Sequence, residues 1–304
     1  MIKYVLNDKF RVKVTDQCNF CCPFCHSEGG KFASDIQIDG DFLKAVLLLR
    51  PYYSRVHITG GEPFLYNNLD KLIDVLQSCD YKTALTTNGF FSLEKQLHTI
   101  EKLEYINFSV HSFRNDYVTS IVKQNRSIEY VMSTITENIN SLTSLLPVRI
   151  NTVVSKDAAA QRVDEVLDFA GNLNLELKLV PEWSVRTEAM KNIRNLLSEK
   201  SFNLFEKIYL LPGSNVRERY KNHNGQIVEV KMIELFQPQF LCKDCEIKAL
   251  CQEGFSFLRL GGNPLYVQPC IFKQKLDTKE FQRKLFPNIC DLFREAGKRC
   301  SSFV

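Results

Sequence analysis

Residues 18–26 read Cys-Asn-Phe-Cys-Cys-Pro-Phe-Cys-His, directly after the strand-like run Phe-Arg-Val-Lys-Val-Thr at residues 10–15. Cys18, Cys22 and Cys25 stand at C-x3-C-x2-C spacing, which lets one loop place three thiolates around a single iron–sulfur cluster. Three protein ligands on a four-iron cluster leave one iron open, and an open coordination position is typical of catalytic metal sites. A structural zinc site and a chance spacing are the alternatives.

Composition limits the class of protein. The 304 residues, 44% of them hydrophobic, suffice for one large α/β domain or for a barrel with a small appended domain. A net charge of +4 over this length does not indicate a nucleic-acid partner. The N-terminus is too polar for a signal peptide, and no apolar run approaches the ~20 residues of a membrane span, so we expect a cytoplasmic protein. Eleven cysteines without a secretion signal favour metal ligation over disulfides.

Strand-like and helix-like segments alternate as far as residue 180, which predicts a parallel sheet with crossover helices. The predicted strands are 10–15, 55–59, 82–87, 105–110, 148–154 and 175–180, and the predicted helices between them include 41–49, 69–79, 128–144 and 160–172. Six such units fit an open, partial (β/α)6 TIM-like barrel better than a closed eight-unit barrel.

The pattern changes beyond Trp183. A helix is predicted over 188–210, a hairpin over 217–234 with an Asn-Gly turn, a second hairpin over 257–272, and then a helical tail. We therefore expect an α/β protein with three regions: the partial barrel (1–183), a connecting helix and hairpin (184–235), and a small C-terminal α+β domain with a helical tail (236–304).

Polar residues gather where predicted strands end. Gly-Gly-Glu-Pro at 60–63 ends the second strand, where two glycines let the backbone approach a ligand and proline stops the strand. Thr87 and Asn88 end the third strand, although Asn-Gly there also reads as a simple turn. Arg149 lies inside an apolar strand, where burial without a partner is costly, so an anionic partner is favoured. These sites share the sheet edge that binds ligands in such folds.

With its cysteine triplet, an aromatic residue (Phe24) before the last cysteine, and Gly-Gly-Glu-Pro, the chain resembles the radical S-adenosylmethionine (radical SAM) superfamily. Residues 12–20 and 25–29 are more narrowly similar to the MoaA-type branch, which includes the molybdenum-cofactor GTP cyclases. The resemblance implies a SAM-binding [4Fe-4S] cluster on Cys18, Cys22 and Cys25. Cys21 offers an alternative spacing, and we take it as a non-ligand.

The resemblance also implies which residues bind SAM. Glu62 and the two glycines would hold its methionine amino group, Arg149 its carboxylate and Asn151 its ribose. The full implied set is Phe24, Gly60, Gly61, Glu62, Thr87, Asn88, Ser109, Arg149 and Asn151.

Four more cysteines follow at C-x2-C-x5-C with a distant fourth: Cys242, Cys245, Cys251 and Cys270. Such a set can hold zinc or close an iron–sulfur cluster. Behind a radical SAM barrel it resembles the auxiliary-cluster domains called twitch and SPASM, which implies a second, auxiliary [4Fe-4S] cluster. We interpret Cys290 and Cys300 as free thiols.

Three departures from the GTP cyclases argue against GTP cyclisation. Those enzymes use three auxiliary cysteines, whereas this chain offers four. Phe257 stands where they carry an arginine paired with the one matched by Arg259, and the chain lacks their terminal Gly-Gly. Full ligation suggests an electron conduit or a scaffold for the substrate pocket.

The implied activity is reductive cleavage of SAM to methionine and a 5′-deoxyadenosyl radical that abstracts hydrogen from a substrate. Oxidation, bond formation or rearrangement would follow, with electrons from a flavodoxin- or ferredoxin-type donor. We expect a small molecule, such as a sugar, nucleoside or natural-product intermediate, because only a few residues precede the first predicted strand, too few for a fused leader-binding domain.

Modification of a ribosomally made peptide is the alternative to a small-molecule substrate, and a non-catalytic iron–sulfur or zinc protein is a third reading. Four residues could face a substrate, although packing or surface roles would serve each equally: His111, Trp183, His223 and Arg259.

Overall fold

The structure is a computed structural model that describes residues 1–25, 34–123, 126–256, 258–270, 272 and 275–301. Residues 26–29 and Phe257, which entered the comparison with MoaA-type proteins, lie outside this part. The strands are β1 (Ile2–Leu6), β2 (Lys9–Lys13), β3 (Arg55–Thr59), β4 (Lys82–Thr87), β5 (Tyr105–Ser109), β6 (Val148–Val154), β7 (Glu176–Pro181), β8 (Asn203–Leu211), β9 (Asn215–Lys221), β10 (Ile227–Ile233), β11 (Arg259–Gly261) and β12 (Tyr266–Gln268).

The α-helices are α1 (Gly40–Leu49), α2 (Leu69–Ser78), α3 (Leu93–Glu101), α4 (Asn115–Ile121), α5 (Ile128–Leu142), α6 (Ala158–Gln161), α7 (Val163–Asn172), α8 (Arg186–Glu199), α9 (Gln239–Cys242), α10 (Thr278–Lys284) and α11 (Phe286–Ser301). Three short 3-10 helices cover Pro63–Leu65, Trp183–Val185 and Lys248–Leu250.

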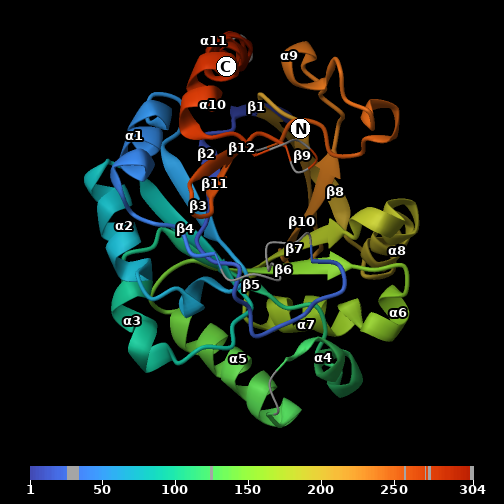
Figure 1. The fold of residues 1–304 in the computed structure, drawn as a ribbon. Coiled ribbons are helices and arrows are strands. Elements are labelled where there is room, and N and C mark those ends of the chain that lie inside the picture. Colours follow the sequence, from blue (N-terminus) through green and yellow to red (C-terminus); the bar gives the residue numbers. More distant parts are fainter. Residues whose placement is uncertain (26–33, 124–125, 257, 271, 273–274, 302–304) are drawn as a thin grey trace.

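The strands form a single curled sheet in the order β1-β8-β9-β10-β7-β6-β5-β4-β3-β2-β11-β12. Strands β2 to β7 are parallel neighbours in chain order. The helices between them lie outside the curl (Figure 1). This arrangement confirms the predicted α/β partial barrel.

Alternation along the parallel strands separates the apolar core from the barrel interior. In β6, Val148 and Ile150 are buried in the apolar core, whereas Arg149 and Asn151 line an interior cavity. In β7, Leu177 and Leu179 are buried in the core and Lys178 lines the cavity. Because successive strand residues point to opposite faces, the sequence pattern itself places polar groups inside the barrel.

Helices that cover the sheet bury one apolar face, and the apolar residues of that face recur with the period of the α-helix. In α2 the buried residues are Leu69, Leu72, Ile73 and Leu76, which stand one turn apart on one helix face. Asp39 caps α1 by accepting hydrogen bonds from the backbone N–H groups of Asp41 and Phe42. These local signals explain why the predicted β/α alternation agrees with the structure.

The helix predicted over 188–210 is wrong in its second half. Helix α8 ends at Glu199, Ser201 takes a left-handed φ of 58°, and strand β8 begins at Asn203. β8 pairs with β1 on one side and with β9 on the other. Hydrogen bonding to two strands therefore overrides the helix-like apolar spacing of this segment.

Strands from outside the six-unit core extend the sheet at both ends. β10 runs parallel to β7, and β11 runs parallel to β2. β1, which precedes the first predicted strand, pairs with β8. All three predicted regions thus contribute to one sheet, and their boundaries at 183/184 and 235/236 remain predictions.

Among the described residues, no helix has both the length and the apolar character needed to cross a membrane.

Candidate functional site

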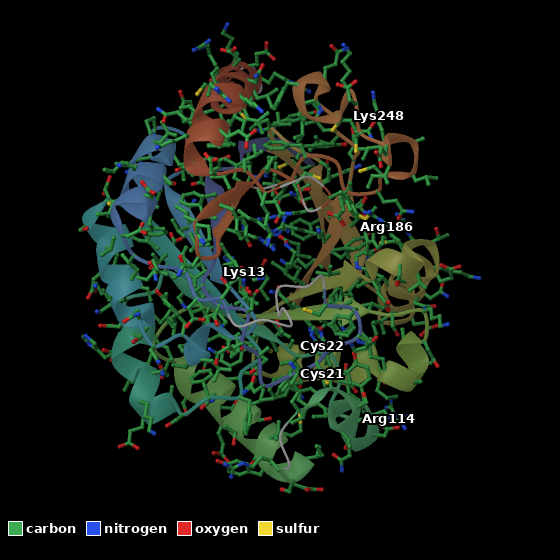
Figure 2. All side chains as sticks on the ribbon, viewed as in Figure 1. Lys13, Cys21, Cys22, Arg114, Arg186 and Lys248 are labelled. Carbon is green, nitrogen blue, oxygen red and sulfur yellow. The ribbon has the colours of Figure 1, made fainter. Side chains whose placement is uncertain are left out.

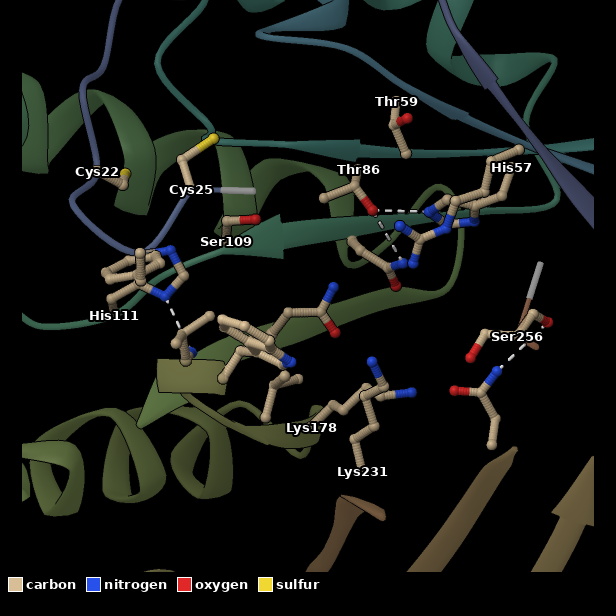
Figure 3. A pocket seen from close by; sticks show the side chains of 18 of the residues that line it. Cys22, Cys25, His57, Thr59, Thr86, Ser109, His111, Lys178, Lys231 and Ser256 are labelled. Carbon is tan, nitrogen blue, oxygen red and sulfur yellow. Dashed lines mark hydrogen bonds between the residues drawn. The ribbon is translucent and has the colours of Figure 1, made fainter. Parts of the chain in front are cut away.

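A cavity of about 600 Å³ lies inside the curled sheet. It begins at the cysteine loop, where Cys18, Cys22 and Cys25 all line it, and reaches Cys270 near the C-terminal hairpin. Figure 3 shows Cys22 and Cys25 on one side of this space and Lys178 and Lys231 on another. The volume is typical of sites that enclose small molecules.

The three predicted cluster ligands belong to one short loop. The Cys25 backbone N–H donates to the Cys22 carbonyl at 3.1 Å, and the Phe20 N–H points at the Cys18 sulfur at 3.3 Å. Burial raises the pKa of Cys22 to about 12, with the thiols of Cys25 and Cys18 acting in the same direction. Three neighbouring thiols at a cavity wall are a donor set suited to iron, because metal binding drives deprotonation of thiols.

Cys21 lines the same cavity, but its sulfur faces the Ser120 carbonyl at 3.9 Å. Figure 2 shows Cys21 beside Cys22 in the loop. The assignment of Cys21 as a non-ligand remains a prediction.

The Gly-Gly-Glu-Pro turn is bonded to the segment that enters the cysteine loop. The Gly61 N–H donates to the Thr15 carbonyl and the Glu62 N–H to the Gln17 carbonyl, both at 2.7 Å. A Cβ atom on Gly61 would lie 2.1 Å from the Gln17 carbonyl oxygen. The second glycine is therefore needed for close packing of two loops, and both Gly60 and Gly61 also line the cavity.

Gly61→Ala is expected to lower the free energy of unfolding by about 1–3 kcal/mol, because the added methyl group forces a backbone shift. Gly40→Ala is the matched control, since a Cβ there meets nothing within 4 Å. Urea unfolding of both variants measures the effect. Equal stability of the two would contradict the packing role of Gly61.

Glu62 is 1% exposed and is not among the residues that line the cavity. Its carboxylate accepts hydrogen bonds from Thr87 Oγ1 at 2.8 Å and from the Asn88 N–H at 2.7 Å. Burial raises the pKa of Glu62 to about 7 against these hydrogen bonds and one from the Phe64 N–H. The side chain thus ties the turn to the end of β4, and its predicted contact with SAM stays a prediction.

The other predicted SAM contacts all line the cavity, namely Phe24, Thr87, Asn88, Ser109, Arg149 and Asn151. Asn88 Nδ2 donates to Asn19 Oδ1 at 2.5 Å and lies 3.9 Å from the Cys18 sulfur. Phe24 packs edge-on against His111, with ring centroids 4.7 Å apart. Their roles toward SAM also remain predictions.

Arg149 has partners within the protein. Its guanidinium lies 4.3 Å from the centre of the Tyr105 ring and 3.3 Å from Glu176. The anionic partner expected for this arginine therefore includes Glu176.

The cavity lining carries more basic than acidic side chains, a pattern that the sequence motifs did not reveal. The basic residues are Lys9, Arg11, Lys123, Arg149, Lys178, Arg217, Lys231 and Arg259, and the acidic residues are Glu176, Glu182, Glu229 and Glu253. Burial lowers the pKa of Lys9, Lys178 and Lys231. Eight basic side chains thus face four carboxylates. Period-two alternation in β2, β7, β9 and β10 is the signal that could have revealed this pattern.

Glu229 is the centre of this group. It is 3% exposed, and it accepts from Lys178 at 2.6 Å and from Arg217 at 3.5 Å. Burial would raise the pKa of Glu229, but Lys178 and Arg217 hold it down to about 2. Within the described residues, Lys9 has no ion-pair partner, although it borders the same group.

The four C-terminal cysteines meet at a second, small cavity of about 10 Å³, where Cys242, Cys245, Cys251 and Cys270 are all lining residues. Cys270 and Gly254 line both cavities. Figure 2 places Lys248, another lining residue of the second cavity, far across the barrel from Cys21 and Cys22.

No three His, Cys, Asp or Glu side chains of the described chain are arranged to hold one metal ion. An iron–sulfur cluster distributes its thiolates over separate irons, so its donors need not converge on one point.

The candidates for substrate contact fall into two groups. His111, Trp183 and Arg259 line the main cavity, whereas His223 is exposed in the turn between β9 and β10. His111 Nδ1 accepts from the Val153 N–H at 3.1 Å, and burial lowers the pKa of His111 to about 4. Cys290 and Cys300 lie on α11 and line neither cavity.

Comparison with known proteins adds a family match. The model of the radical SAM superfamily matches residues 12–170. A GTP 3′,8-cyclase from Helicobacter pylori (strain HPAG1) is 28% identical over 289 residues, covering 90% of this chain and 83% of the relative. A GTP 3′,8-cyclase from Nautilia profundicola is 26% identical over 291 residues, covering 91% of this chain and 85% of the relative.

Among solved structures, Streptococcus suis SuiB bound to S-adenosylmethionine matches with a TM-score of 0.60 and 16% identity, covering 95% of this chain and 67% of that chain. Native anSMEcpe with bound AdoMet matches with a TM-score of 0.57 and 13% identity, covering 97% of this chain and 84% of that chain. At these identities the likeness concerns the fold.

Proposed function

The chain belongs to the radical SAM superfamily, and from this we propose that it is an enzyme that abstracts hydrogen from a small anionic substrate bound inside the barrel. One observation carries the proposal. A single cavity joins the Cys18, Cys22 and Cys25 loop to a lining with twice as many lysine and arginine side chains as carboxylates. Such a lining concentrates anions by electrostatic attraction inside a low-dielectric space.

The superfamily implies a [4Fe-4S] cluster and SAM, and Cys18, Cys22 and Cys25 would hold the cluster. The bound and reduced cluster would supply an electron for the cleavage of SAM, and this chemistry would make hydrogen abstraction from a substrate possible. Gly60, Gly61 and the end of β4 would orient SAM beside the loop. The enclosing strands would keep water away from the reactive species.

We further propose that Cys242, Cys245, Cys251 and Cys270 hold a second [4Fe-4S] cluster. Its place beside the main cavity supports this, since Cys270 and Gly254 border both spaces. With four thiolates, all four irons would be ligated, so this cluster would accept an electron from the substrate instead of binding it. Oxidation or bond formation would then follow hydrogen abstraction.

The second candidate is GTP 3′,8-cyclisation. It is favoured by relatives of that name that align over most of this chain and by the cationic lining, which suits a triphosphate. The fourth auxiliary cysteine argues against it, because full ligation would leave no iron for the purine. GTP is accordingly the first nucleotide to test.

Anaerobic reconstitution tests both levels of the proposal. Reduced with dithionite in the presence of SAM, the protein is expected to form 5′-deoxyadenosine and to contain roughly eight irons per chain. About four irons with zinc present would make the C-terminal cysteines a zinc site. No 5′-deoxyadenosine from protein loaded with its cluster would contradict the enzyme proposal.

The substrate class is tested by adding GTP, other nucleotides, sugar phosphates and their neutral counterparts to the same assay. Anionic compounds are expected to stimulate 5′-deoxyadenosine formation more than neutral ones, whereas stimulation by neutral compounds alone would contradict the assignment. Exchange of dithionite for flavodoxin or ferredoxin tests the proposed electron donor.

A further inference from the structure

A chain of hydrogen-bonding side chains crosses the inner face of β3, β4 and β5. His57 Nε2 lies 2.7 Å from Thr86 Oγ1, and His57 Nδ1 lies 3.4 Å from the Tyr105 hydroxyl. Figure 3 shows the contact between Thr86 and His57 inside the pocket. All three side chains line the main cavity, yet the proposed SAM chemistry uses none of them.

The direction of the hydrogen bonds in this chain depends on the tautomer of His57. Asn107 Nδ2 donates to Thr86 Oγ1 at 3.4 Å, so the threonine oxygen already acts as an acceptor. The tautomer on which this inference is built has the Thr86 hydroxyl donating to His57 Nε2. A neutral imidazole with an accepting Nε2 carries its hydrogen on Nδ1, and that hydrogen is donated to the Tyr105 oxygen.

In this tautomer the Tyr105 oxygen accepts a hydrogen bond from His57, so the hydroxyl hydrogen of Tyr105 is not used in that contact. Within the described residues, the Tyr105 hydroxyl has no hydrogen-bond partner besides His57. Tyr105 lines the cavity, and the Arg149 guanidinium lies over its ring face, where it does not compete for the hydroxyl. In this tautomer the Tyr105 hydroxyl keeps a hydrogen that it can donate to a ligand in the cavity that the residue lines.

Burial favours the uncharged forms of His57 and Tyr105. Burial lowers the pKa of His57 well below its usual value, and Lys9 and Arg11 act in the same direction. Burial raises the pKa of Tyr105, with Arg149 opposing. Near neutral pH the imidazole is uncharged and the phenol keeps its proton.

We propose that Tyr105 donates a hydrogen bond to an oxyanion of the substrate, and that Thr86 and His57 are positioning residues that aim its hydroxyl. This inference rests on the proposed function, since it assumes an anionic substrate in the same cavity. The ligand group is a phosphate or a carboxylate, which the guanidinium groups of Arg11 and Arg149 in the same cavity attract. A neutral analogue of the substrate would accept a weaker hydrogen bond from the Tyr105 hydroxyl than an oxyanion does.

Anion binding to the reconstituted protein tests the role of Tyr105. Calorimetry with inorganic triphosphate and, separately, with citrate compares phosphate and carboxylate ligands. Tyr105→Phe is expected to weaken binding of the preferred anion at least tenfold, the usual range for a hydrogen bond to a charged group. Tyr81→Phe is the matched control, because this buried hydroxyl donates to the Val46 carbonyl at 2.7 Å and does not line the cavity.

The outcomes separate this inference from the proposed function. If neither anion binds the wild-type protein, the substrate class is wrong and the role of Tyr105 fails with it. If an anion binds Tyr105→Phe as tightly as wild type, only the role of Tyr105 fails. Iron content and far-UV circular dichroism of Tyr105→Phe are compared with those of wild type, and equal values show that the variant folds and holds its cluster.

The positioning role has a spectroscopic signature. Nitrogen-15 NMR of histidine-labelled protein with oxidised clusters is expected to show His57 protonated on Nδ1, with the resonance assigned by its loss in His57→Gln. Thr86→Val should mix the two tautomers and weaken anion binding, without removing the Tyr105 hydroxyl. Protonation of wild-type His57 on Nε2 would contradict the proposed hydrogen-bond chain from Thr86 through His57 to Tyr105, whichever anion binds.

Discussion

Replacement of Cys22 by alanine is expected to reduce 5′-deoxyadenosine formation to background and to lower the iron content by about four atoms per chain. Cys22 lines the cavity between Cys18 and Cys25, and its thiol interacts electrostatically with both. A cluster with two remaining thiolates is held too weakly to bind SAM productively. Iron and sulfide analysis together with a chromatographic assay of the nucleoside measures both effects.

The neighbouring Cys21→Ala variant provides a matched control. Cys21 is exposed, lies one residue away and lines the same cavity, but its sulfur faces the Ser120 carbonyl. We expect this variant to keep its iron and its activity. Loss of the cluster in Cys21→Ala, with retention in Cys22→Ala, would show that the alternative spacing supplies the ligands.

Replacement of Glu229 by glutamine is expected to lower the free energy of unfolding at pH 7 by about 3–5 kcal/mol, the usual effect of breaking a buried ion pair. The variant leaves Lys178 and Arg217 with no carboxylate at the position that now balances them. The same change removes a competitor for bound anions, so triphosphate should stabilise Glu229→Gln more than it stabilises wild type. Urea titrations with and without triphosphate measure both effects.

The stabilising effect of Glu229 depends on pH, and the pKa of its carboxyl group gives the direction of that dependence. The pKa of Glu229 is about 2 in the folded protein and 4.5 ordinarily, so the folded state favours the ionised form. Its stabilising contribution is complete above about pH 4.5 and is lost as the pH falls toward 2. The stability difference between wild type and Glu229→Gln should therefore shrink over that window.

Glu165→Gln serves as the surface control for Glu229→Gln. Its carboxylate pairs with Arg162 at 3.1 Å in a half-exposed position, where such pairs contribute about 0–1 kcal/mol. A Glu229→Gln variant as stable as this control would contradict the role assigned to the cavity carboxylate.

The parts of the site that could be predicted from sequence depend on local spacing. Cys18, Cys22 and Cys25 occupy one loop, and Gly60 and Gly61 end one strand, so a few consecutive residues suffice to recognise them. The parallel sheet was predictable for a related reason, because each strand and its helix carry their own apolar period. The C-terminal cysteines were also predicted to meet, and all four line one small cavity.

The unpredicted parts depend on pairing between distant strands. The cationic lining comes from strands such as β2, β7 and β10, and only the sheet order shows that Lys9, Lys178 and Lys231 share one cavity. The contact between His57 and Tyr105 joins residues 48 positions apart. Strand β8 was predicted as helix because its pairing with β1 cannot be seen in its own residues.

The order of the strands also determines when the cavity can form during synthesis. Among the described strands, β1 pairs with β8 alone, and β2 gains its second neighbour when β11 has been made. Contacts of such high sequence separation form slowly, and the emerging N-terminal half must wait for them on the ribosome. Residues of β8, β9, β10 and β11 line the cavity together with Cys18, so its wall is complete only after these strands have been made.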